Sequence, residues 1–322
     1  MMWHSVRRIQ VLASAFLLIA GCGPGQWPGT AGVRRAKPTT SLADARRDFK
    51  SKLAPADGDR EPLPDPPPQV FHRVRYKSPV GELAAYLTTD PRDGERHPAI
   101  VWITGGDCNS VGDVWSEAPA SNDQTASAYR KAGIVMMFPS LRGGNDNPGR
   151  KEGFLGEVDD VLAAADYLAE RAYVDPKRIY LGGHSTGGTL ALLVAESSDR
   201  FRAVFSFGPV DDVGGYGPEY LPFNHADPAE IEVRSPGRWL HSIRSPAYVF
   251  EGTKQQGNLA SLQAMAGASS DPRLHFHPVK GADHFTILSP TNALVAGKIL
   301  RDVGPTVDIA FTEDELTRPF RD

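Results

Sequence analysis

Residues 179–188 read IYLGGHSTGG and constrain this chain more than any other stretch. They begin as a short apolar run of strand-forming residues and lead into the pentapeptide Gly-His-Ser-Thr-Gly. A helical pattern follows at once, over residues 189–196. This order of strand, tight turn and helix places Ser185 on a strained turn with an exposed hydroxyl, since Gly183 and Gly187 bring no Cβ to it. The same pentapeptide also occurs in simple turns, which is the alternative interpretation.

A serine at such a turn is a candidate nucleophile, and we expect Ser185 to have that role. The amides just after Ser185 open a helix, so their unpaired N–H groups face any developing oxyanion. Thr186 is therefore expected to supply one oxyanion donor. A glycine turn follows the apolar run 99–103, and Gly106 or Asp107 is expected to supply the second donor. The alternative for that turn is a plain loop.

A serine hydroxyl needs a base to take its proton, and the base is expected after the last strand of the sheet. Of the nine histidines, His284 alone lies there, after the strand pattern 274–279 and before the last helix. His275 and His277 fall inside that strand pattern, so packing or surface roles are expected for them. A merely solvent-exposed His284 is the alternative.

The acid that would orient His284 is the least constrained member of the site. Glu251 ends the strand pattern 247–251 and is the favoured candidate. Asp211 and Asp212 follow the preceding strand, 201–207, and stay open as alternatives. Asp283 is adjacent to His284 in sequence, and neighbouring side chains usually point apart.

Composition narrows the function classes. The chain has 322 residues, 40% of them hydrophobic and 23% charged, which is enough for one large core. A net charge of −4 without a basic stripe argues against a nucleic-acid partner. The two cysteines, Cys22 and Cys108, do not form a disulfide framework. No ligand cluster with plausible spacing appears, so neither a metal nor an organic cofactor is expected.

The first residues are typical of a targeting segment. Arg7 and Arg8 precede the apolar run 9–20, which is too short to span a membrane comfortably. The run ends in Ile-Ala-Gly-Cys, which resembles a bacterial lipobox and implies cleavage before Cys22 and acylation of its thiol. We therefore expect a lipid-anchored protein of the bacterial cell envelope, on its periplasmic or extracellular face. An ordinary secretory signal is the alternative.

Three regions follow along the chain: a lipoprotein signal peptide (1–21), a proline-rich tether (22–69) and one catalytic domain (70–322). The tether is rich in Pro, Gly and charge and cannot bury enough apolar surface to fold alone. Within it, residues 41–50 are predicted to form a short amphipathic helix that packs on the domain. Strand patterns lie at 70–76, 83–87, 99–103, 134–138, 179–184, 201–207, 247–251 and 274–279, and helical patterns at 122–132, 156–170, 189–196, 259–266 and 292–301. This alternation predicts a largely parallel, doubly wound sheet.

Residues 70–301 resemble an α/β-hydrolase, and within that superfamily the catalytic domain of the prolyl oligopeptidase and dienelactone-hydrolase-like group. The motifs that carry the resemblance are PSLRGG at 139–144, GEVDD at 156–160, VDPKRI at 174–179 and GHSTGG at 183–188. The resemblance implies an α/β-hydrolase fold, with about eight mostly parallel strands and helices on both faces. It also implies a serine hydrolase, either carboxylesterase-like or prolyl oligopeptidase-like.

Two departures from that group matter. The stretch before residue 70 is too short for the β-propeller that gates oligopeptidases, so no size gate is expected. Gln255 stands where many relatives have the triad aspartate. The leading hypothesis is hydrolysis of a small ester, or of a small peptide or amide, through an acyl-enzyme on Ser185. The alternatives are an impaired hydrolase-fold lipoprotein that binds a ligand or partner, and a metal-dependent hydrolase built on the histidines near His284.

Specificity in this fold depends on insertions above the sheet. The main insertion is 214–242, which carries Tyr216, Tyr220, Phe223 and Trp239. These aromatics are expected either to contact the substrate or to form the core of a lid. The sequence identifies neither the substrate nor the oligomeric state.

Overall fold

The computed structural model describes residues 40–54, 61–255 and 257–321. The predicted signal peptide, its cleavage site and the lipidation site Cys22 lie outside these residues. Among the helices in the described ranges, none is long and apolar enough to cross a membrane.

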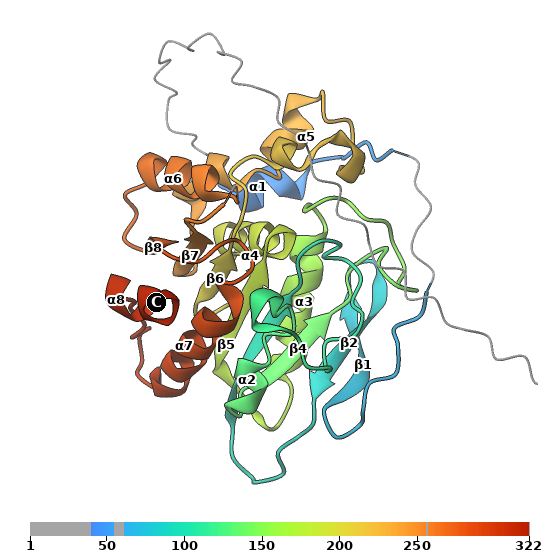
Figure 1. The fold of residues 1–322 in the computed structure, drawn as a ribbon. Helices are drawn as coiled ribbons and strands as arrows, with labels where there is room; N and C mark the ends of the chain where they lie inside the picture. Colours follow the sequence, from blue (N-terminus) through green and yellow to red (C-terminus); the bar gives the residue numbers. More distant parts are fainter. Residues whose placement is uncertain (1–39, 55–60, 256, 322) are drawn as a thin grey trace, which may run out of the picture. The chain divides into compact units, whose positions relative to one another are not determined.

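An eight-stranded sheet forms the centre of the molecule (Figure 1). Its strands are β1 (Phe71–Ser78), β2 (Gly81–Thr88), β3 (His97–Ile103), β4 (Val135–Pro139), β5 (Val174–His184), β6 (Val204–Phe207), β7 (Ala247–Gly252) and β8 (Leu274–Val279). Their order across the sheet is β1-β2-β4-β3-β5-β6-β7-β8. Strands β1 and β2 pair antiparallel with each other, and β2 pairs antiparallel with β4. The remaining pairs are parallel, so the predicted mostly parallel sheet of about eight strands is confirmed.

Helices cover both faces of this sheet, as the alternating pattern predicts. The α-helices are α1 (Leu42–Arg47), α2 (Ala128–Lys131), α3 (Glu157–Ala169), α4 (Thr186–Ser197), α5 (Pro228–Glu232), α6 (Leu259–Ala268), α7 (Leu288–Arg301) and α8 (Glu313–Thr317). Side chains of α3, α4 and α6 pack into one buried apolar layer, while α2, α7 and α8 pack into the other. The central strands are buried along most of their length, which is why they read as continuous apolar runs.

The predicted helix over 122–132 is wrong. The segment contains a short 3₁₀ helix, Ala120–Asn122, then a turn, and then α2, which has only four residues. Asp123 interrupts the helix because its carboxylate accepts the backbone N–H of Thr125 (3.1 Å), which favours a turn. Ala126 then adopts a left-handed conformation with φ of 44°. The interruption places Gln124 at the functional site described below.

Residues 40–54, from the stretch predicted to be a tether, pack on the domain. Leu42 of α1 is fully buried, and its N–H donates to Ser242 Oγ (3.0 Å). Farther along, Leu53 forms a β-bridge with Phe223. We call residues 40–54 the strap and the insertion at 213–242 the roof. Figure 1 shows the strap in blue beside α5 of the roof.

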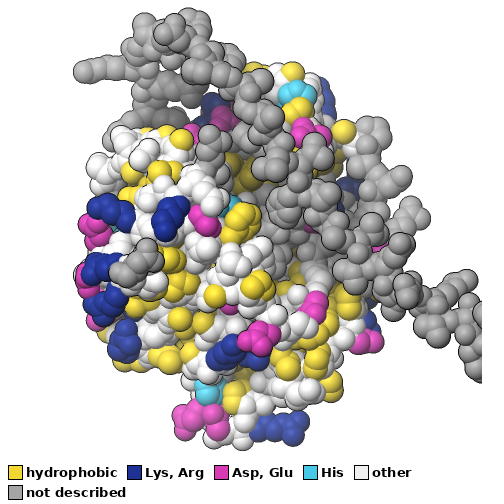
Figure 2. Space-filling model, viewed as in Figure 1, with side chains coloured by type: hydrophobic (Ala, Val, Ile, Leu, Met, Phe, Trp, Pro, Cys, Tyr) yellow, Lys and Arg dark blue, Asp and Glu magenta, His cyan; other side chains and the backbone are white. Residues whose placement is uncertain are grey.

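The face of the molecule in Figure 2 carries acidic and basic side chains interspersed with apolar ones. Several surface charges are paired, including Lys280 with Glu313 (2.8 Å) and Arg273 with Asp271 (2.7 Å). Exposed pairs of this kind contribute little to stability, so the architecture depends on the two apolar layers.

Candidate active site

Ser185 occupies the tight turn between β5 and α4. Its backbone has φ of 54° and ψ of −115°, a conformation that costs a non-glycine residue on the order of 1–3 kcal/mol. The sheet holds this conformation, because the Ser185 N–H donates to the carbonyl of Phe207 on β6 (2.7 Å). A Cβ on Gly187 would lie 2.3 Å from the carbonyl oxygen of Ile103, so only glycine lets α4 start this close to β3. The predicted strand–turn–helix context of Ser185 is therefore present.

The imidazole of His284 is held by a buried carboxylate. His284 follows β8 in a loop, and its Nδ1 lies 2.8 Å from Glu251 Oε2. Glu251 ends β7 and is fully buried. A buried carboxylate at Nδ1 favours the tautomer that carries its proton there, and this leaves Nε2 free to accept a proton.

The carboxylate of Glu251 is itself fixed by two backbone amides. Gly252 N–H donates to Oε1 (2.8 Å), and Asn258 N–H donates to Oε2 (3.2 Å). Gly208, with φ of 58°, leaves room for the pair, since a Cβ there would lie 2.4 Å from His284 Cε1 and 2.7 Å from Glu251 Oε2. Glu251 and His284 thus form a preorganised acid–base pair at the carboxyl ends of β7 and β8.

The other candidate acids point elsewhere. Asp211 accepts the hydroxyl of Ser261 (2.6 Å), while Asp212 pairs with Arg238 (2.7 Å) and caps a turn of the roof. Asp283 accepts the N–H groups of Phe285 and Thr286 (2.9 and 2.8 Å). Partial burial acts to raise the pKa of the Asp283 carboxyl, but the hydrogen bonds from these two N–H groups outweigh it, so the pKa is lowered. The structure brings Glu251 to His284 and leaves Asp211 and Asp212 apart from it.

Ser185 and His284 line the same pocket, of about 320 Å³, together with Lys254, Asn258 and Phe285. Within the described residues Ser185 Oγ makes no hydrogen bond. Catalytic hydrogen bonds are often long in the absence of substrate and tighten when the substrate binds, so the placement is compatible with proton transfer.

The candidate oxyanion donors lie on the opposite side of Ser185. Gly106, Asp107 and Thr186 line a larger cavity, of about 590 Å³, that also contains Ser185. Thr186 Oγ1 donates to the Gly106 carbonyl (2.9 Å) and so ties the glycine turn to the start of α4. The N–H of Gly105 is already used, because it donates to the side chain of Gln124 (3.0 Å). The three residues predicted as possible donors therefore line one cavity together with Ser185.

Comparison with known proteins finds similar sequences among peptidases. Residues 120–234 match the model of the prolyl oligopeptidase family. The uncharacterized peptidase YtmA of Bacillus subtilis (strain 168) is 25% identical over 219 residues, which cover 58% of this chain and 79% of that protein. The dual function macrocyclase-peptidase POPB of Galerina marginata is 29% identical over 128 residues, 35% of this chain and 18% of that protein. The chain thus spans less than a fifth of that fungal relative.

Solved structures give the same fold at lower identity. A puromycin-hydrolyzing peptidase of Mycobacterium tuberculosis matches with a TM-score of 0.57 and 21% identity, over 72% of this chain and 39% of the other. The acylaminoacyl peptidase of Pyrococcus horikoshii matches with a TM-score of 0.59 and 16% identity, over 76% and 43%. This chain has the α/β-hydrolase fold. The predicted fold class is thereby confirmed.

The larger cavity beside Ser185 is mostly apolar. Phe154 and Tyr216 stack with ring centroids 5.6 Å apart, and Leu221 and Pro222 continue the wall. The hydroxyl of Tyr216 lies 2.6 Å from Thr189 Oγ1, and this contact anchors Tyr216 to α4, the helix that follows Ser185. Cys108 also lines the cavity, and burial raises the pKa of its thiol. The cavity is therefore large and apolar enough to hold an apolar group bigger than a single aromatic side chain.

Buried charge holds the wall of this cavity in place. The Arg234 guanidinium is fully buried in the roof and pairs with Glu230 of α5 (2.6 Å). It also donates to the carbonyl of Glu152 (2.9 Å), next to Gly153 and Phe154, and to Ser51 Oγ of the strap (2.7 Å). One side chain therefore ties together the roof, the strap and the loop that carries part of the cavity wall.

Two of the four aromatics predicted for the insertion reach the cavity. Tyr216 lines it and Tyr220 stands at it with 75% of its surface exposed. Phe223 and Trp239 are buried in the roof, and Trp239 Nε1 donates to the Glu232 carbonyl (2.6 Å). The segment thus contributes two aromatics to the wall of the cavity and buries the other two in its own core.

Sequence reasoning missed His184, Gln124 and Arg234. His184 is visible in the motif, but nothing local shows that its ring turns inward, where burial and then the nearby His284 lower its pKa to about 3. Gln124 and Arg234 reach the site through contacts that are distant in sequence, and no local pattern marks such contacts. The metal hypothesis finds no support, because the described residues contain no group of three or more potential ligands. His275 and His277 instead stack on Tyr248, at 4.7 and 6.4 Å between centroids.

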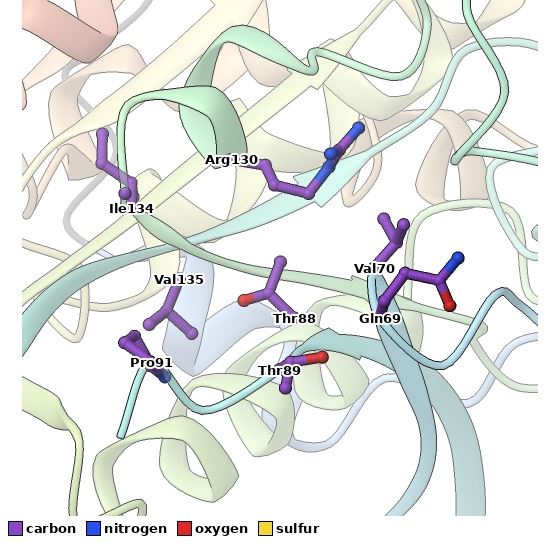
Figure 3. Close-up of a pocket in the computed structure, with 9 residues that line it drawn as sticks. Gln69, Val70, Thr88, Thr89, Pro91, Arg130, Ile134 and Val135 are labelled. Carbon is purple, nitrogen blue, oxygen red and sulfur yellow. The ribbon is translucent and has the colours of Figure 1, made fainter. Parts of the chain in front are cut away.

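A third cavity lies at the other end of the strands. It measures about 170 Å³ and is lined by residues that include Thr88, Arg130 and Val135 (Figure 3). Val135 begins β4, so this cavity opens at the amino ends of the parallel strands. Ligands of doubly wound folds bind at the carboxyl ends, where Ser185, Glu251 and His284 lie. Figure 3 therefore shows a hollow separate from the candidate active site.

Proposed function

We propose that this chain is a serine hydrolase of the peptidase type, which cleaves a small ester, peptide or amide through an acyl-enzyme on Ser185. The observation that carries the proposal is the position of Ser185 on a strained turn, in one pocket with the buried Glu251–His284 pair. The match of residues 120–234 to the prolyl oligopeptidase family supports the peptidase type.

The reaction follows from these positions. Ser185 Oγ attacks the substrate carbonyl carbon as its proton passes to His284 Nε2. The carbonyl oxygen becomes an oxyanion held by the Thr186 amide and by that of Gly106 or Asp107. The tetrahedral intermediate collapses, His284 returns the proton to the leaving oxygen or nitrogen, and an acyl-enzyme remains. Water, activated by the same histidine, then releases the acid and restores Ser185. The Glu251 carboxylate stabilises the imidazolium in both steps.

The two hollows beside Ser185 orient the substrate. The leaving group must lie within reach of His284, because that residue gives it a proton. We therefore assign the leaving group to the 320 Å³ pocket that His284 lines, and the acyl part to the 590 Å³ cavity on the oxyanion side. Apolar acyl groups are the proposed substrates, since Phe154, Tyr216 and Leu221 line that cavity. p-Nitrophenyl esters of increasing acyl length, assayed beside aminoacyl nitroanilides, test this assignment.

The nucleophile is tested by covalent labelling. Wild-type protein should react with a fluorophosphonate probe, whereas Ser185→Ala should lose the label and at least about 10³-fold in kcat while keeping its fold. Ser198→Ala, at the other end of α4, is the matched control and should label normally. Wild-type turnover by Ser185→Ala would overturn the mechanism. A wild-type protein that neither labels nor hydrolyses would favour a ligand-binding role for the fold.

We also propose that the mature protein is anchored to the bacterial envelope by acyl chains on Cys22. Support comes from the sequence alone, through the apolar run 9–20 and the lipobox-like residues before Cys22. Cys22→Ser should move the protein from the detergent phase to the aqueous phase. Cys108→Ser removes the other, buried cysteine and should leave the partition unchanged. Detergent partition of Cys22→Ser would contradict the anchor.

A further inference from the structure

A chain of hydrogen bonds runs through the site behind Ser185, and the proposed mechanism does not use it. The Gly105 N–H donates to Gln124 Oε1 (3.0 Å), and Gln124 Nε2 lies 2.7 Å from His184 Nδ1. On its other side, His184 Nε2 lies 2.9 Å from the backbone carbonyl oxygen of His284. The chain therefore connects the loop after β3 to the loop after β8 and passes through the residue that precedes the nucleophile.

The donor and the acceptor in each of these hydrogen bonds are fixed by the two backbone groups at the ends of the series, the Gly105 N–H and the His284 carbonyl. A backbone N–H can only donate and a backbone carbonyl can only accept. His184 Nε2 must therefore carry a proton for the His284 carbonyl, and Gln124 must turn its oxygen toward Gly105. The amide group of Gln124 then faces His184 Nδ1, which accepts as the unprotonated nitrogen of a neutral ring. Flipping the side-chain amide of Gln124, or moving the His184 proton from Nε2 to Nδ1, would leave two donors or two acceptors facing each other.

The surroundings favour this single pattern. His184 is buried, with 1% of its surface exposed, and its low pKa keeps the ring neutral at physiological pH. Its ring lies 4.5 Å from that of His284 between centroids. Gln124 has a second anchor, because its amide also donates to Asn122 Oδ1 (2.8 Å). The turn that interrupts the helical pattern at Asp123 is what holds Gln124 in reach of His184.

We infer that Gln124 and His184 form a brace that positions the oxyanion loop 105–107 and the base His284 relative to Ser185. The inference rests on the proposed function, and both residues are positioning residues that do not touch the reacting atoms. Gly105 immediately precedes the two candidate donors Gly106 and Asp107, so the hydrogen bond from its N–H fixes the peptide plane from which the chain enters the oxyanion loop. The carbonyl of His284 belongs to the residue whose ring must meet Ser185 Oγ. The brace thus aligns proton transfer and oxyanion binding together.

The brace predicts a loss confined to the transition state. A misplacement of about 1 Å at such a site can cost on the order of 100-fold in rate, while substrate contacts in the two hollows stay intact. Gln124→Met keeps the length of the side chain but removes its hydrogen bonds to Gly105, His184 and Asn122. We expect kcat to fall about 10- to 100-fold with KM nearly unchanged, and affinity for a peptidyl trifluoromethyl ketone, which forms the oxyanion, to fall by a similar factor.

Matched variants separate the brace from general packing. Asn122→Ala removes only the outer anchor of Gln124 and should keep a near wild-type kcat. His184→Gln can still donate to the His284 carbonyl and accept from Gln124, so it should retain more activity than His184→Leu. Thermal unfolding is measured for each variant, because a structural role alone would lower the melting temperature without a selective loss of inhibitor affinity.

The decisive experiment is this panel, assayed for kcat, KM and ketone affinity, with ¹⁵N NMR of the His184 ring in the wild type and in Ser185→Ala. The expected result is a selective loss in Gln124→Met and a His184 ring protonated only on Nε2. Wild-type kcat and ketone affinity in Gln124→Met, or a His184 ring protonated on Nδ1, would overturn the brace. The NMR readout does not need turnover, so a protein that failed to react with phosphonate would refute the proposed function and still test the hydrogen-bond pattern.

Discussion

Two completely buried glutamates, at the ends of β7 and α4, have opposite surroundings. At the end of β7, Glu251 accepts two backbone N–H groups and contacts the His284 ring. Near the end of α4, Glu196 has no hydrogen-bond partner for either carboxylate oxygen among the described residues. Burial raises the pKa of Glu196 well above its ordinary value, which favours a protonated, neutral group. Burial alone therefore does not mark a functional acid; the groups that face it do.

Two further buried glutamates lie between these extremes. Glu230 pairs with the buried Arg234 of the roof (2.6 Å). Glu157, at the start of α3, accepts the N–H groups of Glu152 and Gly153 (2.6 and 3.2 Å) beside the cavity wall. Both hold the roof side of the site in shape, so their removal should affect binding and stability more than chemistry.

Neutralising Glu251 should have the largest effect. Glu251→Gln keeps the shape of the side chain but removes the charge that stabilises the His284 imidazolium, so kcat should fall by about 10²- to 10⁴-fold. Steady-state kinetics measure the loss, and thermal unfolding must show that the fold survives. Asp211→Asn and Asp212→Asn are the matched controls and should stay near the wild-type rate. A collapse in either control with an unaffected Glu251→Gln would move the acid to the loop after β6.

Breaking the buried pair in the roof should be the next largest effect. Glu230→Gln leaves the Arg234 charge without its counterion, which typically costs about 3–5 kcal/mol. We expect a clear loss in the free energy of unfolding and a higher KM for large acyl substrates, with a smaller change for acetyl esters. Denaturant titration and an ester series measure the two effects. Equal changes in KM for short and long acyl substrates would show that the roof does not contribute to recognition of the acyl group.

Glu157→Gln should have a smaller effect than Glu230→Gln. The amide can still accept from the Glu152 and Gly153 amides through its oxygen, but its NH₂ group gains no acceptor that the structure provides. Leaving a buried donor unpaired costs about 1–3 kcal/mol. The melting temperature should fall while kcat on a short ester stays near the wild-type value. A loss of kcat comparable with that of Glu251→Gln would contradict the conclusion that Glu157 supports the structure and not the chemistry.

The smallest effect is expected for Glu196→Gln, which should stabilise the fold where the changes above destabilise it or reduce activity. Its folded-state pKa is raised, so the unfolded chain releases a proton near pH 4.5 that the folded chain retains. Stability is therefore unaffected by this group below pH 4.5 and falls as the pH rises above it. Glu196→Gln should raise the melting temperature by about 2–4 °C at pH 7 and by much less at pH 4, with an unchanged kcat. A destabilised variant at pH 7 would mean that the carboxylate has a partner.

The sequence predicts the sheet and the environment of Ser185 because both depend on local patterns. Apolar runs identify the central strands, and the glycines of the motif identify the turn. The helix predicted over 122–132 is wrong because one Asx turn at Asp123 outweighs a weak helical pattern. Gln124, His184 and Arg234 could not be predicted, since their roles depend on partners up to 183 residues away, as in the bond from Arg234 to Ser51.

The strained backbone of Ser185 links reactivity to folding cooperativity. Its left-handed conformation is held by a hydrogen bond to β6 and by the close approach of α4 to β3, at the centre of the sheet. A serine in this conformation cannot keep its geometry once those strands separate. The strap and the roof do not belong to the central strands, so their opening alone should leave the turn in place. In a denaturant titration, loss of phosphonate labelling should therefore coincide with global unfolding of the sheet, and the nucleophile becomes a built-in reporter of the most protected part of the molecule.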